Sequence, residues 1–451
     1  MKVLMFGWEF PPMITGGLGT ACQGLSAELS HLIEKITFIL PQRVGPGKHP
    51  ETPHLELVDA SELLHREHLN PIKPSMPSNI STELVDSKIQ NSLEFISVSS
   101  ILTPYLSEKE YQQQLKIIQE QTLATGTSKS TASRDSSSQN SVQTFMSGGY
   151  GAHLFSEVSR FSQLATQAVL LDQYDIIHAH DWMTFPAGVA AKRMSRRPLV
   201  LHVHSLEFDR CGDNINQAVY DIERYGLENA DRIIAVSHRT KEMIVSRYGI
   251  SPHLIHVIHN GVTPVEKKVF GHKPFNGPLV SFMGRITMQK GPEYFLNAAY
   301  LVSQKIPNVQ FVMAGHGDLR NRMVLRMAEL QLVDRFHFPG FLNESHRAEL
   351  LSMTDVFVLS SVSEPFGLTP MEALQFGVPV IVSKQSGVSE VLQHAIKVDF
   401  WDARKMADAI IKILSEPSLA LNLGQGGMRE LNTFTWQRPA HQIHQLYKEI
   451  L

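Results

Sequence analysis

Residues 363–374 read SEPFGLTPMEAL, and this stretch decides how the rest of the chain is interpreted. It follows the apolar run VFVL at 356–359, which predicts a buried strand. Glu364 is therefore expected just beyond the carboxyl end of a strand, the edge at which open α/β sheets bind ligands. Residues 369–372, TPME, predict a helix start with threonine as the cap, proline at the first helical position and a capping-box glutamate. That second glutamate has a purely structural interpretation, whereas Glu364 does not.

Strand-like and helix-like segments alternate along the chain, as expected of βαβ units. In the first half, strands are predicted at 2–6, 35–40, 93–98, 175–179, 198–203, 232–236 and 256–258. In the second half, they are predicted at 279–283, 309–314, 336–339, 355–359, 378–383 and 396–399. A linker rich in Gly, Pro and Lys at 260–278 separates the two series. We therefore expect an α/β protein with two Rossmann-like parallel-sheet domains and a ligand-binding cleft between them.

The expected first domain covers residues 1–265 and the second covers 275–430. A Ser/Thr-rich insertion at about 105–148 interrupts the first domain. Its part at 107–122 has the spacing of one amphipathic helix. Residues 125–147 carry few large apolar side chains, so we expect them to be mobile.

Composition narrows the class of protein. The chain of 451 residues has 41 basic and 44 acidic side chains, a net charge of −3, so no overall basic field attracts nucleic acid or anionic membranes. Its two cysteines fit a reducing compartment, and the strand-like start at 2–6 does not resemble a signal peptide. We expect a cytoplasmic protein whose membrane contact is at most peripheral, through the basic cluster at 192–197.

The two glutamates of the opening stretch are separated by seven residues that include Phe366, Gly367 and Leu368. This pattern resembles the donor-site signature of retaining family-4 glycosyltransferases of the GT-B fold, which are related to bacterial glycogen and starch synthases. Further motifs resemble that family in its order: Gly16-Gly17-Leu18-Gly19, His180-Asp181-Trp182, Val203-His204-Ser205, Asn260-Gly261-Val262, Gly284-Arg285, Lys290-Gly291 and Ala314-Gly315-His316-Gly317. The resemblance covers nearly the whole chain except about 45–149. Two departures are Ile14, where glycogen synthases carry a lysine, and Ser386, where relatives commonly carry glycine.

The resemblance implies a hexosyltransferase that moves a sugar, with glucose as the expected one, from a nucleotide diphosphate sugar to a carbohydrate or glucan acceptor with retention. It implies neither a metal ion nor a cofactor besides the donor. Arg285 and Lys290 would bind the diphosphate, Glu364 the sugar hydroxyls, Glu372 the ribose and His180 the transferring sugar. The other donor-binding positions would be Gly16, Gly17, Asn260, Gly315, Gly317, Phe366, Gly367, Leu368 and Thr369. The amphipathic segment at 431–451 would form a helix that crosses back to the first domain.

The residues also have plainer interpretations. Arg285 and Lys290 could be a solvated surface pair, although two cations beside a helix start suit a phosphate. His180 could be structural, and we expect His178 to point away from it and to pack. Asn260 could simply begin an Asn-Gly turn. The glycines at 16–19 lack the full spacing of a dinucleotide-binding loop.

Three other functions are compatible with the motifs. A sugar-nucleotide 2-epimerase of the GT-B fold would act without an acceptor. A phosphorylase would require pyridoxal phosphate. A catalytically silent protein would bind a nucleotide sugar without turnover. There is no Asp-x-Asp motif and no clustered Cys/His spacing in the sequence, so a metal site is not expected. The sequence leaves open the donor nucleotide, the sugar, the acceptor and the oligomeric state.

Overall fold

The computed structural model describes residues 1–11, 17–42, 48–49, 52–60, 63, 154–265 and 273–451. Gly16, the strand predicted at 93–98, the helix predicted at 107–122 and the stretch at 125–147 lie outside these residues. So does most of the insertion expected at 105–148.

The first domain is built on a twisted sheet. In the described part of the chain this sheet has eight strands in the order β3-β4-β2-β1-β5-β6-β7-β8. All neighbours are parallel except β3 and β4. The strands are β1 (Lys2–Phe6), β2 (Lys35–Leu40), β3 (Lys48–His49), β4 (Thr52–Asp59), β5 (Ile176–His180), β6 (Leu199–Val203), β7 (Arg232–Ala235) and β8 (Ile255–Val257). The sequence prediction missed β3 and β4.

The second domain has its own sheet, with six parallel strands among the described residues in the order β11-β10-β9-β12-β13-β14. They are β9 (Leu279–Met283), β10 (Gln310–Ala314), β11 (Phe336–Gly340), β12 (Val356–Leu359), β13 (Val380–Ser383) and β14 (Ile396–Val398). β9 and β12 are buried along their whole length because helices cover both faces, which explains why they read as continuous apolar runs.

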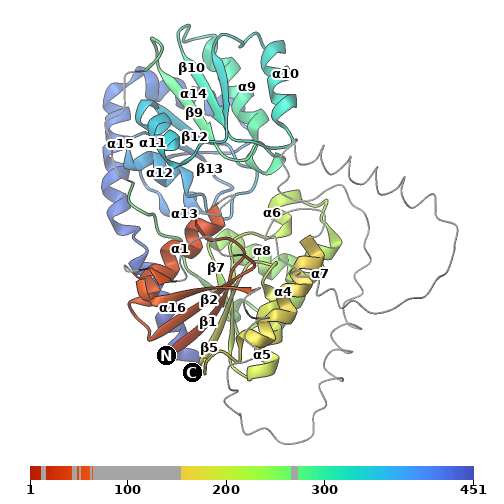
Figure 1. Cartoon of the computed structure of the whole chain (residues 1–451). Coiled ribbons are helices and arrows are strands. Elements are labelled where there is room, and N and C mark those ends of the chain that lie inside the picture. The colour runs from red at the N-terminus through yellow and green to blue at the C-terminus, as the bar shows by residue number, and fades with distance from the viewer. Residues whose placement is uncertain (12–16, 43–47, 50–51, 61–62, 64–153, 266–272) are drawn as a thin grey trace, which may run out of the picture.

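Helices cover both faces of each sheet (Figure 1). On the first sheet, α1 (Gly17–Ser30) packs on one face, and α4 (Leu154–Ala168), α5 (Phe185–Ser195) and α7 (Gln217–Asn229) pack on the other. The other α-helices among the described residues of the first domain are α6 (Glu207–Cys211) and α8 (His238–Tyr248). On the second sheet, α9 (Pro292–Ser303), α10 (Arg320–Glu329) and α14 (Ala403–Ser415) pack on one face. The other face is covered by α11 (Glu344–Met353), α12 (Thr369–Gln375) and α13 (Val388–Val391), and α15 (Pro417–Glu430) lies beside α12. This doubly wound arrangement confirms the predicted α/β class with two parallel-sheet domains.

The last helix, α16 (Gln437–Ile450), leaves the second domain and packs on the first sheet beside α1 (Figure 1). Its apolar face joins the same core as Val3, Met5 and Ile176. The helix is preceded by Trp436, whose indole Nε1 donates a hydrogen bond to Thr263 Oγ1 at 3.1 Å. The segment is therefore part of the first domain's core.

The expected start of α12 is wrong in one detail. The residue before the helix is Leu368, and its side chain makes no capping bond because it has no polar atom. Thr369 is already inside the helix, and Pro370 is among its first residues. Glu372 donates its backbone N–H to Leu368 O at 3.0 Å but is not part of a capping box. The capping-box role expected of Glu372 is therefore wrong.

Candidate active site

Lys290 and Glu364 lie together, although 74 residues separate them in sequence. Lys290 Nζ is 2.5 Å from Glu364 Oε2, and their side chains are only 19% and 8% exposed. Ser361 Oγ donates a second hydrogen bond to Glu364 Oε2 at 3.0 Å. The two residues follow β9 and β12, which are neighbours in the sheet, so both lie at its carboxyl edge.

Short loops hold this pair in place. After β9 the chain forms a single 3-10 turn, η3 (Met288–Lys290), and then enters α9 through Gly291. Gly291 has φ +63°, and a Cβ there would lie 2.2 Å from Ser360 O, so the close contact between the two loops requires glycine. Ser360 Oγ also donates to Gly291 O at 2.9 Å. Lys290 is thus fixed at the amino end of α9, where N–H groups and the helix dipole favour an anion.

Arg285 is bonded to a residue of this turn. Its Nη2 donates to Gln289 Oε1 at 3.1 Å, and Gln289 is 4% exposed. The backbone O of Gln289 accepts from Val362 N at 2.8 Å, so one residue ties Arg285 to the strand-end loop that carries Glu364. Sequence reasoning did not select Gln289, although it lies directly between two predicted cations.

The glycine loop after β10 packs onto the loop after β9. Gly315 has φ +139°, and a Cβ there would lie 1.8 Å from Gly284 O. A Cβ on Gly317 would lie 2.3 Å from Ile286 O, and Ile286 N donates to His316 O at 2.7 Å. The loop is therefore bonded directly to the residues that flank Arg285.

The turn at 366–368 reaches the first domain. Phe366 is 3% exposed, and its ring centroid lies 6.0 Å from that of His259. Gly367 has φ +104°, and a Cβ there would lie 3.1 Å from Glu364 Cγ. A Cβ on Gly17 would lie 3.7 Å from Leu368 Cδ1, so the amino end of α1 faces this turn. Gly17 and Leu368 are thereby brought together from different domains.

Glu372 lies on α12 near Arg347 of α11, whose Nη1 is 3.5 Å from its Oε1. Burial raises the pKa of Glu372 above its usual value, and Arg347 partly opposes this. Asn260 is 8% exposed at the end of the first domain's sheet, where a Cβ on Gly261 would lie 2.6 Å from Trp436 N. Close packing against the segment before α16 gives this turn a structural role.

His180 ends β5 and is 1% exposed. Its Nδ1 lies 3.1 Å from His204 Nε2, and its ring stacks on His178 with centroids 4.4 Å apart. The expectation that His178 points away is wrong, because residues i and i+2 of a strand share a face. His202 of the adjacent strand completes the group, which we call the histidine stack: His178, His180, His202 and His204.

Burial governs the charge of the histidine stack. It lowers the pKa of His178 and of His204 to about 3, and it lowers the pKa of His180 and His202 well below the usual value. The neighbouring imidazoles act in the same direction. His180 is therefore a neutral imidazole at neutral pH, suited to hydrogen bonding rather than to donating a proton.

Among the residues that the structure describes, two histidine groups and one interdomain group have donor atoms close enough to be considered for a metal ion. They are Cys22/His180/His204, His178/His180/His202 and His238/His259/Glu390, with donor atoms within 4.8 Å of one another. Imidazole lone pairs lie in the ring plane, and the stacked rings are within 13–29° of parallel. Stacked rings of this kind do not aim their lone pairs at one point. Sequence spacing missed the first two groups because their members come from separate elements: β5, β6 and the residue after it, and, for Cys22, α1.

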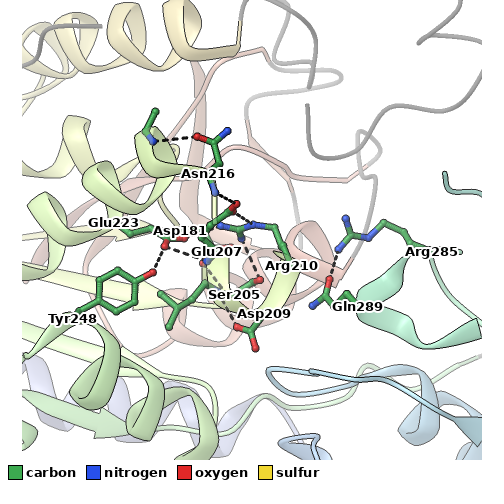
Figure 2. A network of polar contacts seen from close by, with 12 residues as sticks. Asp181, Ser205, Glu207, Asp209, Arg210, Asn216, Glu223, Tyr248, Arg285 and Gln289 are labelled. Atoms are coloured by element: carbon green, nitrogen blue, oxygen red, sulfur yellow. Dashed lines mark hydrogen bonds and ion pairs between the residues drawn. The ribbon is translucent and has the colours of Figure 1, made fainter. Parts of the chain in front are cut away.

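A buried ionic network lies beside η3 (Figure 2). Arg210 of α6 donates to Glu207 at 2.9 Å and to Glu223 at 2.7 Å, and all three side chains are at most 5% exposed. Tyr248 also donates its hydroxyl to Glu223. Burial raises the pKa of Glu223 to about 7, and Arg210 opposes that rise.

The same helix carries Asp209, which is bonded to the second domain. Asp209 Oδ1 accepts from Ser363 Oγ at 2.5 Å. Its other oxygen accepts from Leu206 N at 3.0 Å, which holds the start of α6. Ser363 directly precedes Glu364, so this bond ties α6 to the loop that carries Glu364, in addition to its contact with η3. Sequence reasoning missed this contact because the two residues lie in separate domains.

Comparison with solved structures identifies the architecture. Sucrose-phosphate synthase from Thermosynechococcus elongatus superposes with a TM-score of 0.68 at 20% identity, over 99% of this chain and 98% of that one. Trehalose-6-phosphate synthase gives 0.66 at 11% identity over the whole of both chains. An Anabaena protein, HepE, solved with UDP-glucose, gives 0.63 at 16% identity, again over both whole chains. The chain has the GT-B fold of these glycosyltransferases.

Sequence comparison gives the family. Residues 266–430 match the model for glycosyl transferases group 1, 129–266 match glycosyltransferase family 4 and 2–86 match the starch synthase catalytic domain. An uncharacterized glycosyltransferase of Methanocaldococcus jannaschii is 30% identical over 298 residues, 62% of this chain and 76% of that protein. The α-maltose-1-phosphate synthase of Mycolicibacterium smegmatis is 30% identical over 311 residues, which are 61% of this chain and 79% of that protein. A glycogen synthase of Mycobacterium tuberculosis is 25% identical over 60% of this chain and 68% of that protein.

The chain belongs to the group 1 glycosyltransferases, of the glycogen and starch synthase type. Among the helices described, none combines the length and apolar character needed to cross a membrane.

Proposed function

We propose that the protein transfers a hexose, with glucose as the expected sugar, from a nucleoside diphosphate sugar to a carbohydrate or glucan acceptor with retention of anomeric configuration. The observation that carries this proposal is the pairing of Lys290 with Glu364 at 2.5 Å, beside Arg285 and opposite the amino end of α1. One carboxylate and two cations in one place suit a sugar joined to a diphosphate. HepE with UDP-glucose and the glycogen synthase relative support the donor and acceptor classes.

Each residue has a distinct part in the proposed reaction. Arg285 and Lys290 stabilise the negative charge that builds on the leaving diphosphate as the glycosidic bond breaks. Glu364 accepts hydrogen bonds from sugar hydroxyls, and Glu372 accepts them from the ribose. The neutral His180 supplies a hydrogen bond to the transferring sugar. These fixed charges do the work that a divalent cation does in other transferases, so we expect activity to survive a chelator.

Retention follows if the acceptor hydroxyl attacks on the face from which the diphosphate leaves. The new C–O bond forms as the bond to the diphosphate breaks, and a diphosphate oxygen takes the hydroxyl proton. No protein nucleophile and no separate base is needed. This is consistent with the low pKa of His180, which leaves that side chain uncharged.

The test combines donor binding with product analysis. UDP-, ADP- and GDP-sugars are screened by thermal shift, and nucleotide release is measured with and without glucan or simple sugar acceptors. Lys290→Ala should lower turnover about 100- to 1,000-fold with the fold retained. The control is Lys384→Ala, which removes an exposed lysine paired with Asp399 in the same domain and should leave turnover unchanged.

Each outcome separates the proposal from its rivals. Acceptor-dependent release and an α- or β-configuration matching that of the donor support retaining transfer. Conversion of the donor without acceptor identifies an epimerase instead. Donor binding without any release identifies a silent binder. Full activity of Lys290→Ala contradicts the assigned site.

A further inference from the structure

Glu390 lies in the second domain, yet its carboxylate is bonded to the first. Glu390 Oε2 accepts from His238 N at 2.9 Å, and Oε1 accepts from Arg239 N at 2.8 Å. These are the first two N–H groups of α8, an eleven-residue helix. His259 Nε2 lies 3.2 Å from Oε2 and provides a third contact from the first domain. A carboxylate at a helix amino end is favoured by the free N–H groups and by the helix dipole.

The surroundings show that this contact is close and partly buried. The side chains of His259 and Glu390 are 27% and 21% exposed. Burial alone would raise the pKa of Glu390, but the bonds from His259 and the two N–H groups hold it below its usual value. A Cβ on Gly387, three residues before Glu390, would lie 2.6 Å from Ser237 Cβ. The two domains therefore have no room to move closer at this point.

A second set of bonds joins the same helix to the candidate site. Arg239 Nη2 donates to Ser363 Oγ at 3.0 Å, and Ser363 Oγ donates to Asp209 at 2.5 Å. Ser363 is next to Glu364. The backbone of Glu364 is in turn fixed by the loop that leads to α13, because Gly387 N donates to Glu364 O at 2.9 Å. Glu390 and Glu364 thus belong to one bonded unit that α8 and α6 hold from the other domain.

We propose that Glu390 is a positioning residue that keeps the two domains closed, so that Glu364 and the donor sugar are aligned with the first domain. The proposal rests on the transfer reaction proposed above. The donor contacts assigned to Arg285, Lys290 and Glu372 all lie within the second domain. Loss of the Glu390 carboxylate therefore leaves these three contacts intact and disrupts what needs both domains, including the contact proposed between His180 and the transferring sugar.

The chain provides a matched control. Glu430 accepts from Gln393 N at 2.8 Å, from His394 N at 3.1 Å and from His394 Nδ1 at 3.0 Å. This repeats the pattern of Glu390, with two consecutive backbone N–H groups and one imidazole, but inside the second domain. Glu430→Ala removes the same number and kind of bonds without affecting the domain contact.

The experiment compares Glu390→Ala, the milder Glu390→Gln and Glu430→Ala with the unmodified protein. Small-angle X-ray scattering gives the radius of gyration, calorimetry gives the donor dissociation constant, and steady-state assays give kcat and KM. We expect Glu390→Ala to increase the radius of gyration and to lower kcat about tenfold or more, a larger factor than any loss of donor affinity, because the diphosphate and ribose contacts stay within the second domain. Glu390→Gln should change both quantities in the same direction by less, and Glu430→Ala should change neither.

The scattering result does not depend on the reaction. If the unmodified protein transfers no sugar, the proposed function fails, while the change in radius still tests the role of Glu390 in closure. An unchanged radius in Glu390→Ala overturns the proposal. So does an equal loss of kcat in Glu390→Ala and Glu430→Ala, because that result would indicate general destabilisation.

Discussion

The histidine stack predicts a defined response to acid when His178 is replaced. His178 is fully buried on β5, and its Nδ1 lies 2.5 Å from the hydroxyl of Tyr447 on α16. Burial lowers its pKa from 6.5 to about 3, so the folded protein holds it neutral while the unfolded chain binds a proton. Above pH 6.5 this group costs the folded protein no stability. As the pH falls from 6.5 toward 3, the unfolded chain binds a proton at His178 that the folded protein does not, so the free energy of unfolding decreases.

The expected change in unfolding free energy follows from the lowered pKa of His178. At pH 5.5, one unit below the unfolded pKa, protonation of the unfolded chain at His178 costs the fold about 1.4 kcal/mol, and at pH 7.5 the cost is close to zero. His178→Asn removes this term. The cavity and the lost contact with Tyr447 also destabilise the variant, but equally at both pH values. The difference in unfolding free energy between the two proteins should therefore shrink by about 1.4 kcal/mol from pH 7.5 to 5.5.

Comparing the two proteins cancels the contributions of titrating groups outside the histidine stack. Burial raises the pKa of Asp181 and of Glu223 to about 7, which makes the fold more stable in acid, but both groups are present in both proteins. Urea unfolding is followed by tryptophan fluorescence, because Trp8, Trp182 and Trp436 are all buried in cores of the first domain. His346→Asn, at an exposed histidine on α11, is the control. A difference that stays constant, or widens in acid, would refute the assignment of a neutral, buried His178.

Three further outcomes are expected. Arg210→Met leaves two buried carboxylates without their cation and should lower the unfolding free energy by about 3–5 kcal/mol in urea titrations. An unchanged urea midpoint would show that the network contributes no net stability. Gly315→Ala places a methyl group 1.8 Å from Gly284 O, so calorimetry should show donor binding weakened while the first domain keeps its stability. Trp436→Ala should destabilise the first domain by about 3–5 kcal/mol, visible as a lower melting temperature; retention of wild-type stability would show that the packing of Trp436 contributes little to the first domain.

The sequence predicted the features that depend on local pattern. Apolar runs such as 279–283 and 356–359 mark buried parallel strands, and the polar residues directly after them must lie at the sheet's carboxyl edge. This is why Lys290 and Glu364 could be placed on one side of the second domain before their contact was seen. The order of the motifs, rather than any single one, indicated the family.

What the sequence missed depends on contacts between distant segments. β4 was overlooked because its alternation of polar and apolar residues is partial, and its pairing with β2 supplies the missing stability. The sequence favours Thr369 as a helix cap, but the helix already includes it and begins directly after Leu368. Glu390 and Asp209 could not be recognised, since each is defined by a partner in the other domain.

The placement of α16 has a consequence for how the protein is made. The first sheet is completed in sequence by β8 at Ile255–Val257, yet one of its faces is covered by Trp436, Leu446 and Tyr447, about 190 residues later. At a synthesis rate of about 5–20 residues per second, roughly 10–40 seconds separate the two events on the ribosome. During that interval an apolar surface of the first sheet is uncovered, and the second domain can fold before the first is finished. A nascent chain of this design can complete its first domain only after the second has been synthesised, when α16 covers that surface.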